Sequence, residues 1–278
     1  MLHVNLFDNN FYHTKNIVGE LTSTYYYPPT KIKYLDRLEE YDGITLFTDD
    51  FIFNPIVDKV KSRLKIAWLF EPRVFSDYYD RILEIEDKFD YILTYDAELL
   101  KRSPKYIKYI VGQSRVPDDV AKIYPKTKNI SMIASNKSIS SGHKYRHELI
   151  NKFHSEYKFD LWGSGYRSFD NKLDPLKDYK YSICVMNSRV DNFFTEVLVD
   201  CFRVGTIPIF WGCPNIGEYF DVDGMYIFEN DQELKDILDS IIFHPTCVVD
   251  PNTIQSNFEK AKEYIHTDDF IANILSKL

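Results

Sequence analysis

The stretch from Tyr179 to Tyr219 constrains the fold of this chain more than any other. It opens with an apolar segment that ends at Val185 and predicts a buried strand. Apolar residues then recur at helical spacing up to Gly205, where a helix is expected to end. The apolar segment Thr206–Trp211 predicts a second strand, which a Gly-Cys-Pro turn ends. This order of strand, helix and strand predicts a βαβ unit and therefore a parallel sheet.

The same alternation continues through the rest of the chain. Strands of a first α/β domain are expected at 2–7, 43–48, 65–70 and 89–94, and strands of a second at 130–135, 159–163 and 225–228. Helices are expected at 57–64, 76–88, 145–153, 232–243 and 253–278. The segment 117–128 carries two prolines and is interpreted as a linker. We therefore expect domains at 1–120 and 121–278, with a last helix able to pack back on the first domain.

Charge and composition exclude several classes of protein. The net charge of −8 argues against a nucleic-acid partner, which needs a basic face. The aromatic content of 16% suits stacking on sugars or nucleotides, but a tyrosine-rich core is the simpler and favoured interpretation. No apolar run approaches the ~18 residues of a membrane span. The chain opens directly with an expected strand, so a soluble, cytoplasmic protein is expected. The cysteines form no C-x-x-C pair and are expected to be reduced core thiols: Cys184, Cys201, Cys213 and Cys247.

Three short motifs in the constraining stretch resemble those of a known family. They are Met186–Ser188, Thr195–Val197 and Thr206–Gly212. In this order they resemble glycosyltransferase family 10, the α1,3/4-fucosyltransferases, most closely its bacterial members. Weaker likeness extends outward over about 60–70% of the chain. The resemblance implies the glycosyltransferase B architecture, in which two Rossmann-like domains face a cleft. Two positions depart from the family pattern, because Val197 replaces a lysine and Met186 a glutamate.

Glu71 is the candidate catalytic base. It follows the expected strand 65–70, and carboxyl ends of strands are where ligands bind in such sheets. The resemblance implies that this glutamate takes the proton of the acceptor hydroxyl. A carboxylate paired with Arg73 is the alternative interpretation. Asp49, Asp50 and Asp96 also follow expected strands and are further candidates.

The donor-site candidates come from the second domain. Arg146 can hold two phosphate oxygens at once, and the resemblance supports this role, although an exposed helix arginine is the alternative. The resemblance implies that Glu196 holds donor hydroxyls, and a simple acid at a helix start is its alternative. Turn formation or core packing competes with binding at most of the other candidates, which are Asn136, Asn187, Ser188, Arg189, Phe193 and Thr195.

No metal or cofactor is expected, because the nucleotide-sugar is a substrate and the family's leaving group is met by cations and a helix N-terminus. Asp221 and Asp223 spell a D-x-D motif, which is too short to outweigh a solvated turn.

The sequence therefore predicts an inverting glycosyltransferase that moves fucose from GDP-fucose to a hydroxyl of a glycan acceptor. Because Val197 replaces the family lysine, a different GDP- or UDP-sugar donor, such as a UDP-pentose or hexose, is the first alternative. The second is a non-catalytic protein that binds a nucleotide or a sugar.

Overall fold

The computed structural model describes residues 1–278 except 10, 12–18, 24–27 and 244–248, and it divides into two units. Unit 1 comprises Met1–Gln113 and His266–Leu278, and unit 2 comprises Ser114–Ile265. The expected boundary at residues 120 and 121 falls inside unit 2. Each unit is a parallel α/β structure.

Unit 1 is built on a six-stranded sheet of order β2-β1-β3-β4-β5-β6, in which every pair is parallel. Its strands are β1 (Leu2–Phe7), β2 (Ile32–Asp36), β3 (Glu40–Thr48), β4 (Lys61–Trp68), β5 (Tyr91–Thr94) and β6 (Tyr106–Lys108). Short helices follow three of them: α2 (Ile56–Lys59), α3 (Tyr78–Arg81) and α4 (Ala97–Leu100). The last residues of β3 and β4 are buried without alternation, as expected for parallel strands covered on both faces.

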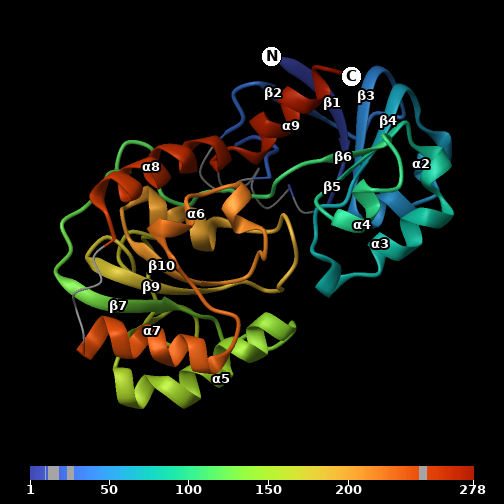
Figure 1. The fold of residues 1–278 in the computed structure, drawn as a ribbon. Coiled ribbons are helices and arrows are strands. Elements are labelled where there is room, and N and C mark those ends of the chain that lie inside the picture. Colours follow the sequence, from blue (N-terminus) through green and yellow to red (C-terminus); the bar gives the residue numbers. More distant parts are fainter. Residues whose placement is uncertain (10, 12–18, 24–27, 244–248) are drawn as a thin grey trace. The chain divides into compact units, whose positions relative to one another are not determined.

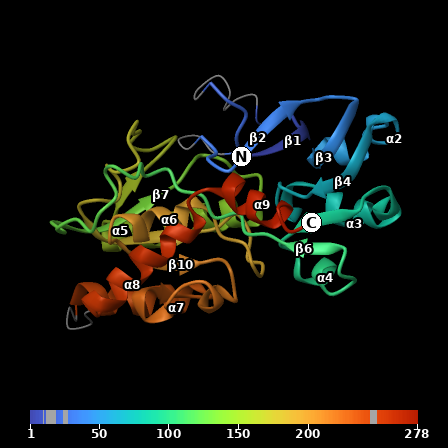
Figure 2. The same ribbon diagram turned by 90° about the horizontal axis from the view of Figure 1, so that it is seen from above.

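The C-terminal helix α9 (Thr267–Leu275) belongs to unit 1, where it lies beside β2 (Figure 1, Figure 2). Asp268 of this helix is 1% exposed. Its carboxylate accepts hydrogen bonds from the Thr22 hydroxyl at 2.5 Å, the Ser23 N–H at 3.0 Å and the Tyr34 hydroxyl at 2.9 Å. The helix is therefore held to the first hundred residues by a buried polar anchor.

Unit 2 is a three-layer α/β structure. Its five-stranded parallel sheet has the order β11-β10-β9-β7-β8. The strands are β7 (Lys128–Ile133), β8 (Asp160–Trp162), β9 (Tyr179–Val185), β10 (Ile207–Trp211) and β11 (Tyr226–Ile227). Figure 1 shows helices α6 (Glu196–Arg203) and α8 (Pro251–Ala261) on one face of the sheet, and α5 (Ser141–Tyr157) and α7 (Asp231–Phe243) on the other.

The expected βαβ unit is confirmed, since β9 and β10 pair in parallel and α6 connects them. Apolar residues on both faces of β9 and β10 are buried, which explains their nearly continuous apolar sequence. Gly205 has a φ of 70°, a left-handed conformation that glycine adopts freely, and it follows the end of α6.

Some expected elements are wrong in extent. A helix was expected over 57–64, but α2 ends at Lys59 and residues 61–64 begin β4. Those residues are largely polar, and they are in strand conformation because they pair with the start of β3. The expected helix 76–88 is a short α3 followed by 3-10 turns, and 253–278 is two helices separated by residues 262–266. Strands β2 and β6 were not expected from the sequence.

Cys184, Cys201 and Cys213 are buried free thiols, as expected, while Cys247 lies outside the described residues. Among the residues that the structure describes, no helix is both long enough and apolar enough to cross a membrane.

Candidate functional site

The start of α5 lies against the loop that follows β9. The Ser140 hydroxyl caps the helix by accepting the His143 N–H at 3.2 Å. The Gly142 N–H donates to the Asn187 carbonyl at 3.0 Å. A Cβ on Gly142 would collide with the Met186 carbonyl oxygen, so only glycine permits this approach. The helix N-terminus, with its partial positive charge, is therefore held at the carboxyl end of β9.

Arg146 lies one turn further along α5 and is buried. Its Nη2 donates to the Val185 carbonyl at 2.6 Å and to Asn187 Oδ1 at 3.4 Å. Burial lowers the pKa of the guanidinium, and the nearby negative charge of Glu196 opposes that effect. The Nε of Arg146 has no hydrogen-bond partner among the described residues. A buried cation with an unused donor at a strand end is suited to bind an anion.

Glu196 opens α6, which the Thr195 side chain caps by accepting the Val197 N–H at 3.5 Å. The Glu196 side chain is 17% exposed, and Arg115 Nη2 lies 3.6 Å from its Oε1. Burial disfavours the charged form, but Arg115 and Lys172 outweigh it and hold the pKa of the carboxyl below its usual value. Glu196 is therefore an ionised acceptor that can receive hydrogen bonds from sugar hydroxyls.

A buried ion pair supports the same face of α6 one turn later. Asp200 is fully buried and accepts from the Ser114 hydroxyl at 2.7 Å and the Arg115 N–H at 2.8 Å. The Nζ of Lys172, which is also buried, lies 3.7 Å from Asp200 Oδ2. Arg115, Lys172 and Arg146 thus place three cations around Glu196.

Sequence reasoning missed Arg115 and Lys172. Arg115 stands just before the segment that was interpreted as a linker, and Lys172 stands in the long loop between β8 and β9. No local spacing connects either residue to α6. The one sequence signal that could have pointed to further cations is Val197, because it replaces a lysine of the family pattern.

The remaining donor-site candidates occupy different environments. Asn187 is half-buried beside Arg146, and Ser188 is buried next to it. Arg189 is exposed and pairs with Glu229. The ring of Phe193 is 1% exposed and packs in the interior, while Asn136 is exposed in the loop after β7.

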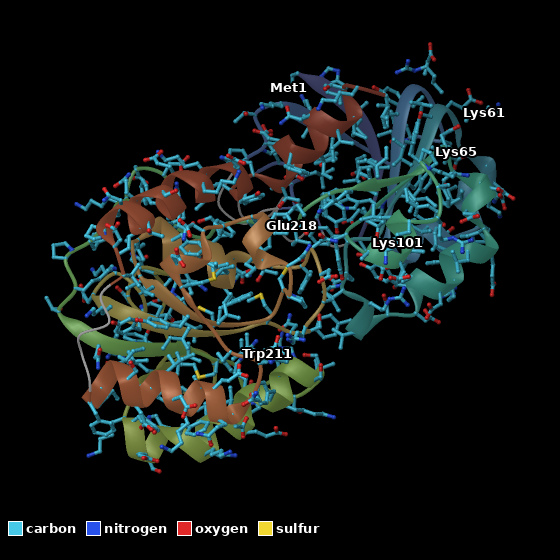
Figure 3. All side chains as sticks on the ribbon, viewed as in Figure 1. Met1, Lys61, Lys65, Lys101, Trp211 and Glu218 are labelled. Atoms are coloured by element: carbon cyan, nitrogen blue, oxygen red, sulfur yellow. The ribbon has the colours of Figure 1, made fainter. Side chains whose placement is uncertain are left out.

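A pocket of unit 2 has a volume of about 470 Å³. Trp211, which Figure 3 labels, stands at the end of β10 and forms its aromatic wall together with Tyr145 of α5. The two ring centroids are 5.0 Å apart. The Tyr145 hydroxyl donates to Asp231 at 3.0 Å. The polar lining of the pocket consists of Lys152, Glu229, Asn230, Asp231 and Gln232. An aromatic wall with amide and carboxylate groups can receive a planar nucleobase.

In unit 1, the segment that carries Glu71 is held by buried polar groups. The N–H groups of Phe70 and Glu71 donate to Asp49 Oδ1 at 3.1 and 3.0 Å. The Glu71 carbonyl accepts a hydrogen bond from the Tyr79 hydroxyl at 2.9 Å, and the Leu69 carbonyl accepts one from the buried Tyr109 hydroxyl at 2.8 Å. The backbone of Glu71 is thus fixed while its side chain is half-exposed.

The other carboxylates at the strand ends of unit 1 have structural partners. Arg73 pairs with Asp80 at 2.7 Å and with Asp96 at 3.1 Å. Asp96 also caps α4 by accepting two backbone N–H groups. Asp50 is exposed and accepts from the Tyr78 hydroxyl.

Among the described residues, no group of three or more histidines, cysteines and carboxylates is placed to hold a metal ion. Of the D-x-D motif, Asp221 accepts the Asp223 N–H at 3.0 Å and so caps a turn.

Two parallel-sheet α/β units define the glycosyltransferase B fold, which confirms the expected fold class. The chain is similar to a crystal structure of an alpha1,3-fucosyltransferase with GDP-fucose, with a TM-score of 0.61 and 16% identity over 99% of this chain and 89% of that one. It is also similar to a crystal structure of an alpha1,3-fucosyltransferase with GDP, with a TM-score of 0.58 and 15% identity over 99% of this chain and 90% of that one. A crystal structure of TarM has a TM-score of 0.54 at 14% identity, covering 84% of this chain and 54% of that one.

Part of the sequence of unit 2 matches a family model. Residues 123–242 match the model of glycosyltransferase family 10 (fucosyltransferase), C-terminal part. The chain is similar to the alpha-(1,3)-fucosyltransferase FucT of Helicobacter pylori, with 29% identity over 83 residues, and to a putative fucosyltransferase-like protein of Arabidopsis thaliana, with 27% identity over 106 residues. These matches cover 29% and 37% of this chain, but only 17% and 20% of the two relatives.

Proposed function

We propose that this protein is a glycosyltransferase that moves fucose from GDP-fucose to a hydroxyl of a glycan acceptor with inversion at the anomeric carbon. The observation that carries the proposal is the cluster of Arg146, Arg115 and Lys172 around Glu196 at the start of α6. Arg146, Lys172 and Glu196 lie within the segment that matches the fucosyltransferase family model, and Arg115 lies shortly before that segment.

The charges of this cluster suit a sugar nucleotide. Its cations and the N-terminus of α6 meet the negative diphosphate, and they stabilise the additional charge that develops as GDP departs. Glu196, held ionised by its neighbours, accepts hydrogen bonds from hydroxyls of the sugar. Arg115 and Lys172 bring positive charge to the start of α6, where Val197 replaces the lysine of the family pattern.

The reaction needs one proton acceptor. The acceptor oxygen attacks the anomeric carbon of fucose, the bond from that carbon to the phosphate oxygen breaks, and GDP leaves with the electron pair. Glu71 takes the proton of the attacking hydroxyl. Its fixed backbone and half-exposed side chain suit a group that must reach a substrate without moving the chain. We propose that the reaction requires no metal, since side-chain cations neutralise the diphosphate.

The pocket of Tyr145 and Trp211 supplies a place for the guanine ring, because the wall is aromatic and carboxylates can accept the N–H groups of guanine. The same carboxylates fit uracil less well, which favours a GDP-sugar over a UDP-sugar.

The test is a donor screen with chelator present. The purified chain is incubated with GDP-fucose, other GDP-sugars and UDP-sugars, and both nucleotide release and glycan products are measured. GDP and GDP-fucose are expected to raise the melting temperature, because ligands that bind only the folded state stabilise it. The Glu71→Gln variant is expected to keep this shift and to lose transfer, whereas Glu84→Gln, an exposed glutamate of the same unit, is expected to keep both.

Three results would change the proposal. Stabilisation and turnover with UDP-sugars alone would favour the donor alternative. Stabilisation by GDP without turnover in the original chain would favour a non-catalytic binding protein. Full dependence on a divalent cation would overturn the metal-free mechanism.

A further inference from the structure

Asp49 stands at the point where β3 ends in unit 1, and its environment is unusual for a carboxylate. Its φ is 43°, in the left-handed region that residues other than glycine rarely adopt. The residue is 5% exposed, although it follows directly on the last residue of the strand. The chain thus turns sharply there and directs a carboxylate into the protein.

The two oxygens of Asp49 have different partners. Oδ1 accepts the backbone N–H groups of Phe70 and Glu71, and so it joins the end of β3 to the segment after β4. Oδ2 is buried without a hydrogen-bond partner among the described residues. One oxygen therefore positions the backbone of Glu71, and the other receives no hydrogen bond from the part of the chain that the structure describes.

The charged and titratable groups that face Asp49 come from several elements. Asp8 after β1 and Glu71 after β4 contribute negative charge, and the phenols Tyr78 and Tyr79 of α3 and Tyr109 after β6 contribute no cation. Burial raises the pKa of Asp49 to about 7, the two backbone N–H groups oppose this, and Glu71 and Asp8 add to it. Asp49 therefore changes charge near neutral pH.

We propose that Asp49 is a positioning residue for Glu71, holding its backbone through one oxygen and strengthening it as a base with the negative charge of the other. The inference rests on the proposed function, in which Glu71 accepts the proton. Repulsion between two carboxylates is mutual, so an ionised Asp49 makes a proton on Glu71 more favourable. The base is then strongest above the pH at which Asp49 ionises.

Asparagine separates the two contributions of Asp49. The Asp49→Asn side chain can still accept both backbone N–H groups through its oxygen, but it carries no charge. Its plateau kcat is expected to fall about tenfold, a fraction of what general base catalysis supplies, with KM for GDP-fucose changed less than about twofold. The acid limb of its kcat/KM profile is expected to lie at lower pH than that of the original chain. The Asp49→Ala variant also loses the backbone contact and is expected to lose about a hundredfold in kcat.

The matched control is Asp50→Asn, an exposed aspartate next in sequence. It is expected to leave kcat, KM and the pH profile unchanged. An Asp49→Asn profile that coincides with those of the original chain and of Asp50→Asn would overturn the inference, because a residue with a merely structural role does not move a pH profile.

A second measurement does not need activity. The carboxyl carbons of aspartate and glutamate are labelled with ¹³C, and the resonances are followed by NMR as the pH is changed. Glu71→Gln and Asp49→Asn identify the two signals. The Asp49 signal is expected to titrate near pH 7, and the Glu71 signal to show a second step there that Asp49→Asn removes.

The two measurements separate failure of the inference from failure of the proposed function. A Glu71 signal without a second step overturns the coupling whether or not the chain transfers fucose. If no sugar donor is turned over but both signals show the coupled steps, the charge coupling stands and the proposed catalytic use of Glu71 is refuted.

Discussion

Replacing Asp268 by alanine should unfold unit 1 at a much lower urea concentration and leave unit 2 unchanged. The buried carboxylate accepts hydrogen bonds from Thr22, Ser23 and Tyr34, which lie more than two hundred residues away in sequence. Alanine removes the carboxylate that these three buried donors share, at a cost of about 1–3 kcal/mol for each lost hydrogen bond. Losses above about 5 kcal/mol are exceptional for one substitution, so we expect about 4 kcal/mol. With an m value of about 2 kcal/mol per molar urea, the midpoint falls by about 2 M.

Tryptophan fluorescence can report on each unit separately. Of the three tryptophans, Trp68 lies in unit 1, and Trp162 and Trp211 lie in unit 2. Urea titrations are run with Trp68 as the sole tryptophan for unit 1, and with Trp68 replaced by phenylalanine for unit 2.

The matched control is Asn273→Ala in the same helix, which removes an exposed hydrogen bond to Lys31. It is expected to change the unfolding free energy by less than about 0.5 kcal/mol. Asp268→Asn keeps one acceptor oxygen and is expected to lie between the two. The reasoning is refuted if Asp268→Ala and Asn273→Ala have the same Trp68 midpoint, or if Asp268→Ala shifts both units equally.

Three further predictions concern charges in the two units. Burial raises the pKa of Asp49 in the folded protein to about 7, well above the unfolded value, so the stability contributed by its protonated form is lost as the pH rises through 7. At pH 8.5 the Asp49→Asn variant should therefore be more stable than the original chain. The difference in unfolding free energy, measured by urea titration, should be at most about 4 kcal/mol. Lys172→Met removes a cation beside Glu196 and should weaken GDP binding about tenfold in calorimetry, whereas Lys177→Met should not. Arg146→Lys cannot contact two phosphate oxygens as a planar fork and should weaken GDP about ten- to a hundredfold, and equal affinity would exclude it from the diphosphate site.

The parallel sheet of unit 2 could be predicted because its signals are local. The strand that ends at Val185, the helix that ends before Gly205 and the strand 207–211 each carry a pattern that one short stretch contains. Burial on both faces of these strands produces the continuous apolar runs that identified them.

The parts that failed depend on partners elsewhere in the chain. Residues 61–64 are strand because they pair with β3, and their polar side chains give no strand pattern. The pairing with β3 therefore decides their conformation, and the helix expected over 57–64 is wrong beyond Lys59. Strands β2 and β6 are five and three residues long and lie at the two edges of the sheet, where patterns are short.

The candidate site divides in the same way. Glu196 could be proposed from a motif in the stretch 179–219 and Arg146 from the weaker resemblance outside it, and the structure places the two residues near each other at the end of β9. Arg115 precedes the first strand of unit 2, and Lys172 lies in the long loop between β8 and β9. Both lie close to the start of α6 in the structure, but no sequence spacing predicts that they do. The role of Asp49 toward Glu71 depends on hydrogen bonds between the ends of two strands.

Helix α9 also bears on the order in which the protein can fold during synthesis. Residues 114–265 form a compact unit that lies, in sequence, between the two segments of unit 1, so unit 2 can fold before residues 266–278 are made. Thr22, Ser23 and Tyr34 are made well before Asp268, whose carboxylate accepts their hydrogen bonds in the folded unit. Unit 1 can therefore complete this buried anchor only after the whole of unit 2 has been made between its two segments.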